Sequence, residues 1–170
     1  MYWQHHLPST LTEGQTFLVV GGLADGSKVK FIDSTRCVDV ESMFCRHEEA
    51  DTRMIFHASA AARSGFERVV VNSPDTDVLV LLVHFACLIG CEVWLRLPKG
   101  GRLYAAHYIA RSLGATLCQV LPAFHAITGC DTTSCLVRQG KVKPWEMLKT
   151  NITLYSVVGD LGKKKPEKRY

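Results

Sequence analysis

The sequence predicts an α/β fold with a largely parallel central sheet, and three observations lead to this class. Short apolar strands alternate with helical segments through the middle of the chain, which is typical of parallel strands joined by helices. The 170 residues amount to about one domain, and a composition of 47% hydrophobic residues is enough to bury a core. The longest apolar run, residues 78–83, is far shorter than the roughly 18 residues of a membrane helix, so no membrane partner is expected.

The first 40 residues predict an irregular arm followed by a small antiparallel unit. Residues 1–16 are polar and show no period. Phe17–Val20 and residues 28–32 are strand candidates, and Ala-Asp-Gly-Ser at 24–27 lies between them, which favours a β-hairpin. Residues 37–40 form another short extended segment.

A helix and a strand follow. From Glu48 onward, apolar residues recur at three- and four-residue spacing, and Gly65 stands where a helix would end. The β-branched run Arg68–Asn72 predicts a strand that is covered on both faces.

The rest of the domain predicts further helices and one more strand. The pattern indicates a helix over 76–88, a strand over 92–97, a turn over 98–102, helices over 103–113 and 116–127, and a loop over 128–133. Pro144 opens a short helix that ends at Lys149. The predicted organisation is therefore an arm (1–16), an α/β domain (17–150) and a C-terminal segment with a basic tail (151–170).

The formal net charge of +4 lies in the tail. Residues 163–170 contain five basic residues and one acid, so the remaining 162 residues hold 15 of each sign. This excludes a wholly basic binder and indicates a neutral body with a cationic end.

The N-terminus lacks the pattern of a secretory signal, which indicates an intracellular protein. The three consecutive lysines at 163–165 are a nuclear signal, a phosphate contact or a solvated end.

Acidic residues cluster where elements are expected to begin or end. Asp75 and Asp77 follow the strand at 68–72, and ligands of open α/β sheets bind at the carboxyl ends of strands. Glu49 and Asp51, with Glu48 beside them, crowd a first helical turn, where the helix dipole favours acids in any protein. Asp131 lies in the loop after a helix, a common place for a turn aspartate. Together these acids suit Mg²⁺ or Mn²⁺, which prefer carboxylate oxygens.

The same residues carry a family resemblance. Glu49-Ala50-Asp51-Thr52, Asp75-Thr76-Asp77 and Gly129-Cys130-Asp131, in that order, resemble the internal region of flap endonucleases and related structure-specific 5′ nucleases of the PIN-like group. Lys141-Val142-Lys143 after Gly140 resembles their glycine- and lysine-containing hairpin. The longer strings HEEADTRM, SPDTDV and HA-x-TGCDTTS are similar to a set of animal proteins linked to mobile elements.

This resemblance implies a PIN-like, Rossmann-like three-layer domain that hydrolyses DNA phosphodiesters by two-metal catalysis. DNA is the implied partner and RNA an alternative, with Lys141 and Lys143 binding the nucleic acid. The implied catalytic and metal-binding residues are Glu49, Asp51, Asp75, Asp77 and Asp131.

One departure from the family keeps other functions open. The family's upstream acidic elements have no counterpart here, so the domain is interpreted as N-terminally truncated. Asp33 ends a strand of similar local pattern and is a weak candidate for one of these elements. The alternatives are a catalytically incomplete module that binds nucleic acid or protein, and a phosphatase in which Asp75 and Asp77 supply the paired acids. His47, His57 and His125 are interpreted as half-buried structural residues.

Overall fold

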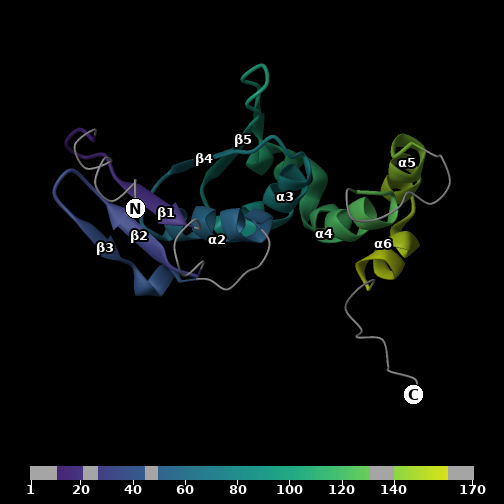
Figure 1. Ribbon diagram of the computed structural model, residues 1–170. Coiled ribbons are helices and arrows are strands. Elements are labelled where there is room, and N and C mark those ends of the chain that lie inside the picture. The colour runs from purple at the N-terminus through teal and green to yellow at the C-terminus, as the bar shows by residue number, and fades with distance from the viewer. Residues whose placement is uncertain (1–10, 21–26, 45–49, 131–139, 161–170) are drawn as a thin grey trace. The chain divides into compact units, whose positions relative to one another are not determined.

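A computed structural model describes residues 11–20, 27–44, 50–130 and 140–160. Within these ranges the protein is mixed α/β, with two three-stranded sheets and five α-helices (Figure 1). The chain divides into two compact units, Met1–Arg53 and Met54–Tyr170. The boundary falls inside the first described α-helix, α2 (Ala50–Arg63). In the described ranges, no helix has the length and apolar character needed to cross a membrane.

The first unit contains an antiparallel sheet of three short strands, β1 (Phe17–Val20), β2 (Val29–Ile32) and β3 (Cys37–Asp39). Phe17 lies opposite Ile32, which confirms the antiparallel pairing predicted for these two strands. Most of the turn predicted at 24–27 lies outside the described residues. A short 3-10 helix, η2 (Glu41–Met43), follows β3.

The second unit contains the other sheet, formed by β4 (Arg68–Asn72), β5 (Glu92–Arg96) and β6 (Leu103–Ala105). β4 and β5 are parallel and are joined through α3 (Asp77–Ile89), as predicted, but β6 is antiparallel to β5. The described residues therefore do not form the largely parallel central sheet that was expected. The cause is a tight reversal after β5, in which Gly100 and Gly101 adopt φ of 83° and 63°. The returning chain pairs with β5 as a strand, so the helix predicted from residue 103 begins at residue 106 instead.

The core of the second unit lies where α3 and α4 (Ala106–Ile127) pack against each other and against β5. The buried side chains of α3 recur at helical spacing: Val78, Leu82, Val83, Ala86 and Ile89. In β4, Val71 is buried against this core, whereas Val70 on the opposite face is 45% exposed. The expectation that β4 is covered on both faces is therefore wrong, because alternate residues of a strand face opposite sides and only one side meets the core.

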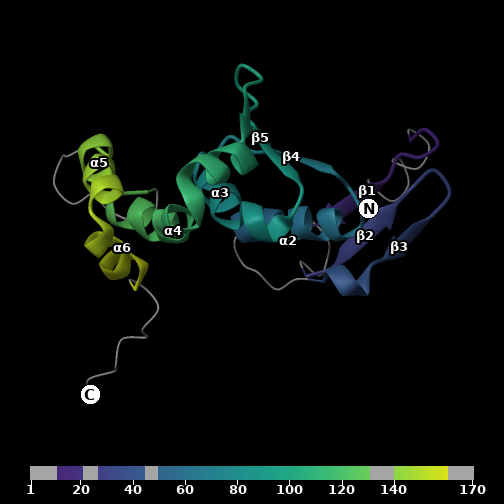
Figure 2. The same ribbon diagram turned by 180° about the vertical axis from the view of Figure 1, so that it is seen from behind.

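A break and a second cluster of buried side chains follow along α4. Gly114 has φ of 78° and ψ of 162°, which separates two helical stretches close to those predicted at 103–113 and 116–127. Beyond the break, α4 packs with the C-terminal helices α5 (Val142–Thr150) and α6 (Ile152–Gly159) (Figure 2). This cluster contains Val120, Phe124, Leu148 and Val158.

Candidate functional site

A turn of five residues at the carboxyl end of β4 holds two of the candidate acids. Ser73 is 3% exposed, its N–H donates to the carbonyl of Arg96 at 3.2 Å, and its Oγ accepts the N–H of Asp75 at 3.1 Å. The Oδ1 of Asp75 in turn accepts the N–H of Asp77 at 2.8 Å, where α3 begins. Asp75 therefore lies between β4 and α3, and Asp77 is the first residue of α3. Both are at the carboxyl end of β4, where ligands of parallel sheets bind.

His125, from the end of α4, reaches the second of these acids. Its Nε2 lies 2.7 Å from Oδ1 of Asp77, and its Nδ1 lies 3.0 Å from Nζ of Lys141. A lysine ammonium has only donors, so Lys141 donates to an unprotonated Nδ1. The ring proton is then on Nε2 and is donated to the carboxylate. Asp77, His125 and Lys141 form one chain of charge-assisted hydrogen bonds.

Each carboxylate keeps one oxygen outside these contacts. Asp75 and Asp77 are half-buried, and within the described ranges their protein hydrogen bonds use Oδ1 alone. Mg²⁺ is commonly held by one or two protein carboxylates together with water and substrate phosphate, so this pair fits the protein's share of one such ion. No group of three or more His, Cys, Asp or Glu side chains able to hold a metal occurs among the residues that the structure describes.

The other acids predicted for the site lie either outside the described residues or in the other unit. Glu49 and Asp131, like Glu48, lie outside the described residues. Asp51 lies in the first turn of α2 and belongs to the first unit, whereas Asp75 and Asp77 belong to the second. Of the five candidate metal ligands, the structure brings together these two.

Asp33 has a local structural role in the first unit. In the turn between β2 and β3, its Oδ1 accepts the N–H of Thr35 at 2.8 Å, the hydroxyl of Thr35 at 2.8 Å and the N–H of Arg36 at 2.9 Å. The Nε of Arg36 lies 3.0 Å from Oδ2. The bonds from Thr35, followed by those from Arg36, lower the pKa of Asp33 to about 2. This aspartate organises a turn.

The two predicted basic residues differ in position. Lys141 contacts His125 directly, so it is linked to Asp77 through the imidazole ring. Lys143 is exposed within the first turn of α5.

Two residues of the site were not among the predicted site residues. Ser73 is fixed by the turn chemistry of Ser-Pro-Asp, a signal that sequence reasoning could have used. His125 is predicted to be structural because an isolated histidine on an amphipathic helix is usually a half-buried structural residue. Its role depends on the packing of α4 against α3, which no local pattern contains.

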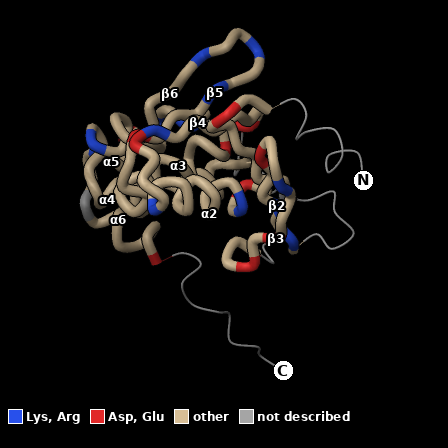
Figure 3. Tube along the Cα trace, turned by 90° about the vertical axis from the view of Figure 1, so that its left-hand side faces the viewer, with Lys and Arg blue, Asp and Glu red and all other residues tan. Residues whose placement is uncertain are grey.

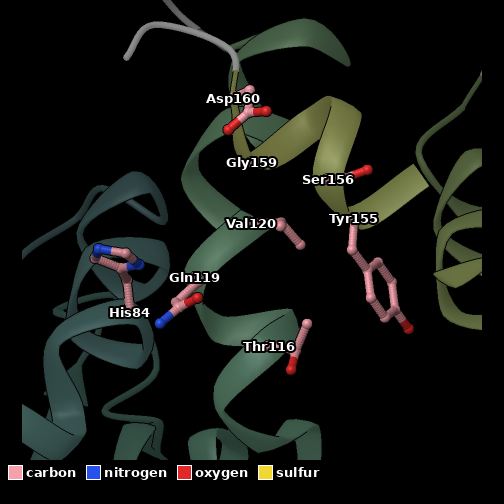
Figure 4. A pocket seen from close by; sticks show the side chains of 8 residues that line it. All are labelled: His84, Thr116, Gln119, Val120, Tyr155, Ser156, Gly159 and Asp160. Carbon is pink, nitrogen blue, oxygen red and sulfur yellow. The ribbon is translucent and has the colours of Figure 1, made fainter. Parts of the chain in front are cut away.

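A separate cavity of about 490 Å³ lies between α3, α4 and α6 (Figure 4). It is lined by His84, Thr116, Gln119, Val120, Tyr155, Ser156, Gly159 and Asp160. Nδ1 of His84 is 2.7 Å from the carbonyl oxygen of Cys118, so this nitrogen carries the ring proton and donates it. Neither Asp75 nor Asp77 lines this cavity, which is therefore distinct from the acidic pair.

Comparisons with protein-family models, with curated proteins and with solved structures found no match to this chain. Functional conclusions for the protein rest on its own residues and their geometry.

Proposed function

We propose that this protein is a PIN-like, divalent-cation-dependent domain that binds DNA and hydrolyses its phosphodiester bonds. The observation that carries the proposal is the pair of carboxylates at the carboxyl end of β4, Asp75 and Asp77, with Lys141 linked to them through His125. Two acids with a lysine on the other side of the connecting imidazole suit a ligand that arrives as a phosphate together with a cation.

Each residue has a distinct part in this proposal. Asp75 and Asp77 hold Mg²⁺ or Mn²⁺ through their second oxygens. An ion held there would supply neutralisation of the phosphate charge and a bound water of lower pKa. His125 fixes the carboxylate of Asp77 through Nε2, and Lys141, which has further N–H donors, contacts the substrate phosphate. Glu49, Asp51 and Asp131 stay predicted metal ligands on the family resemblance alone.

A second candidate is a module that binds nucleic acid without cutting it. It is favoured by the engagement of Asp77 with His125, and by the lack of a group of three metal-ligating side chains within the described ranges. In this case the acidic pair organises the start of α3 and the basic residues carry the binding.

Cleavage of flap and nicked DNA by the full chain, with Mg²⁺ or Mn²⁺ present, tests the proposal. The informative variant is Asp75→Asn, because asparagine keeps an Oδ1 that accepts the N–H of Asp77 and therefore preserves the turn while removing the charge. We expect this variant to lose cleavage and to bind Mn²⁺ more weakly in calorimetry.

Glu146→Gln is the matched control. Glu146 is an exposed acid of the same unit that pairs with Lys149 at 2.8 Å, away from β4. Its neutral variant should cleave like the wild type. Equal cleavage by the wild type and Asp75→Asn would contradict the proposal. A wild type that binds DNA but neither binds Mn²⁺ nor cleaves would establish the second candidate instead.

A further inference from the structure

Basic residues are segregated in the second unit. From residue 93 to residue 130 the sequence contains four arginines and lysines and no aspartate or glutamate. Three of the four, Arg96, Lys99 and Arg102, lie within seven residues of one another, at the end of β5 and in the loop that leads to β6. Figure 3 shows basic and no acidic residues along this loop.

These three residues lie on a two-stranded ribbon that projects from the sheet. Arg96 pairs with Leu103 across the two strands, and the N–H of Leu97 donates to the carbonyl of Arg102 at 3.0 Å, which extends the ladder by one pair. In Figures 1 and 2 the ribbon extends beyond α3 and α4 of the same unit. Arg96, Lys99 and Arg102 are all exposed.

The charges are distributed over both faces of the ribbon. Paired residues share a face and successive pairs alternate, so Arg96 and Arg102, which belong to adjacent pairs, lie on opposite faces. Lys99 lies near the tip, between Pro98 and the glycines at 100 and 101. A Cβ added at either glycine would meet no atom within 4 Å, so there is open space where each of these side chains would lie.

The base of the ribbon adjoins the acidic pair. Arg96 lies opposite Asn72, the last residue of β4, and its carbonyl accepts the N–H of Ser73. Ser73 begins the turn that carries Asp75 and Asp77. One continuous backbone connection therefore places the basic ribbon beside the candidate site.

We propose that this ribbon enters the major groove of double-stranded DNA, where Arg96, Lys99 and Arg102 contact phosphates on both walls of the groove. The major groove of B-form DNA is about 12 Å wide and admits a two-stranded β-ribbon. Basic residues on both faces match a groove bordered by two phosphate backbones, and the lack of acids within the ribbon removes repulsion. The inference rests on the proposed function in taking DNA as the ligand, and it adds the form of DNA and the surface that holds it.

Binding of labelled duplex DNA, followed by fluorescence anisotropy in EDTA at several salt concentrations, tests the proposal without any dependence on cleavage. The variant Arg96→Gln/Lys99→Gln/Arg102→Gln removes three phosphate contacts. The slope of the logarithm of its binding constant against the logarithm of salt concentration should be less negative by about 2.7. Its affinity at 0.1 M salt should be lower by about two orders of magnitude.

The matched control is Arg63→Gln/Arg68→Gln/Lys149→Gln, which removes the same charge from α2, from the amino end of β4 and from α5. It should bind within about threefold of the wild type, since surface charges away from the contact act only through a screened field. Circular dichroism and thermal unfolding establish that both variants are folded.

Several results would overturn the inference. They are a ribbon variant that binds with the affinity and salt slope of the wild type, a control variant that loses as much affinity, and a wild type that does not bind duplex DNA. Equal affinity for duplex RNA of the same sequence would also overturn it, because the deep, narrow major groove of A-form RNA does not admit the ribbon. Binding to duplex DNA in EDTA without any cleavage in Mn²⁺ would refute the proposed hydrolysis and leave the ribbon's role intact.

Discussion

The hydrogen bond between Asp77 and His125 should contribute measurably to stability, although it joins residues 48 positions apart. The bond is 2.7 Å long, and the side chains of His125 and Asp77 are 18% and 27% exposed. A hydrogen bond to a charged group contributes about 1.5–3 kcal/mol when well shielded. Partial exposure reduces this value, so we expect a coupling free energy of about 1–1.5 kcal/mol.

A double-mutant cycle isolates this coupling from the cost of truncating each side chain. Asp77→Ala, His125→Ala and the double variant are unfolded in urea at neutral pH, and the free energies of unfolding are compared at equal m-values. The sum of the two single losses should exceed the loss in the double variant by about 1–1.5 kcal/mol. A coupling below about 0.3 kcal/mol would refute the inference that the two residues form a charge-assisted bond.

Nitrogen NMR of the His125 ring checks the proton assignment independently of stability. In the wild type, Nε2 should carry the proton and Nδ1 should not, because the ammonium of Lys141 donates to Nδ1. Lys141→Met removes this donor, so the fraction of the other tautomer should rise. A wild-type ring with its proton on Nδ1 would contradict the assigned chain of bonds.

Two further predictions concern the two units separately. Because the pKa of Asp33 is lowered to about 2, below the ordinary value near 3.9, its carboxylate stabilises the β2–β3 turn above about pH 4 and loses this effect as the pH falls toward 2. NMR titration of the Asp33 carboxyl carbon should give a midpoint near 2, and a midpoint near 3.9 would contradict the turn bonding. In α3, Leu82→Ala should lower the free energy of unfolding by about 3 kcal/mol because Leu82 is 0% exposed, whereas Leu88→Ala, at 79% exposure, should change it by less than about 0.5 kcal/mol. Equal losses in urea unfolding would contradict the packing of α3.

Local patterns were sufficient for most of the secondary structure. The apolar segment 76–88 predicts a helix close to α3, and the alternation in 28–32 predicts β2. β6 was not predicted, because its three residues are too few to show the alternation of a strand. The apolar spacing of 103–113 predicts a helix over the whole segment. The strand exists because the loop after β5 returns the chain to pair with it, and this pairing is not encoded within residues 103–105 themselves.

In the candidate site, local sequence is sufficient to place the two acids, whereas the histidine is placed by contacts between residues far apart in the sequence. Asp75 and Asp77 could be placed at the end of β4 because a β-branched run followed by Ser-Pro-Asp indicates both the strand and its termination. Their partner could not be placed, since His125 reaches Asp77 only through the packing of α4 on α3. The pairing gives His125 a role in positioning an acid, where sequence alone suggested a structural histidine.

The net charge conceals this basic ribbon, because a sum over 162 residues cancels positive and negative charges that lie far apart. At physiological ionic strength a charge acts over about 8 Å, so a polyanion responds to the charges near its contact. Successive strand residues advance about 3.3 Å, which keeps Arg96, Lys99 and Arg102 within roughly one screening length of their neighbours along the ribbon. A neutral body can therefore attract DNA at this ribbon, and a cation held by Asp75 and Asp77 would remove the repulsion of the adjacent acids for the same phosphate backbone.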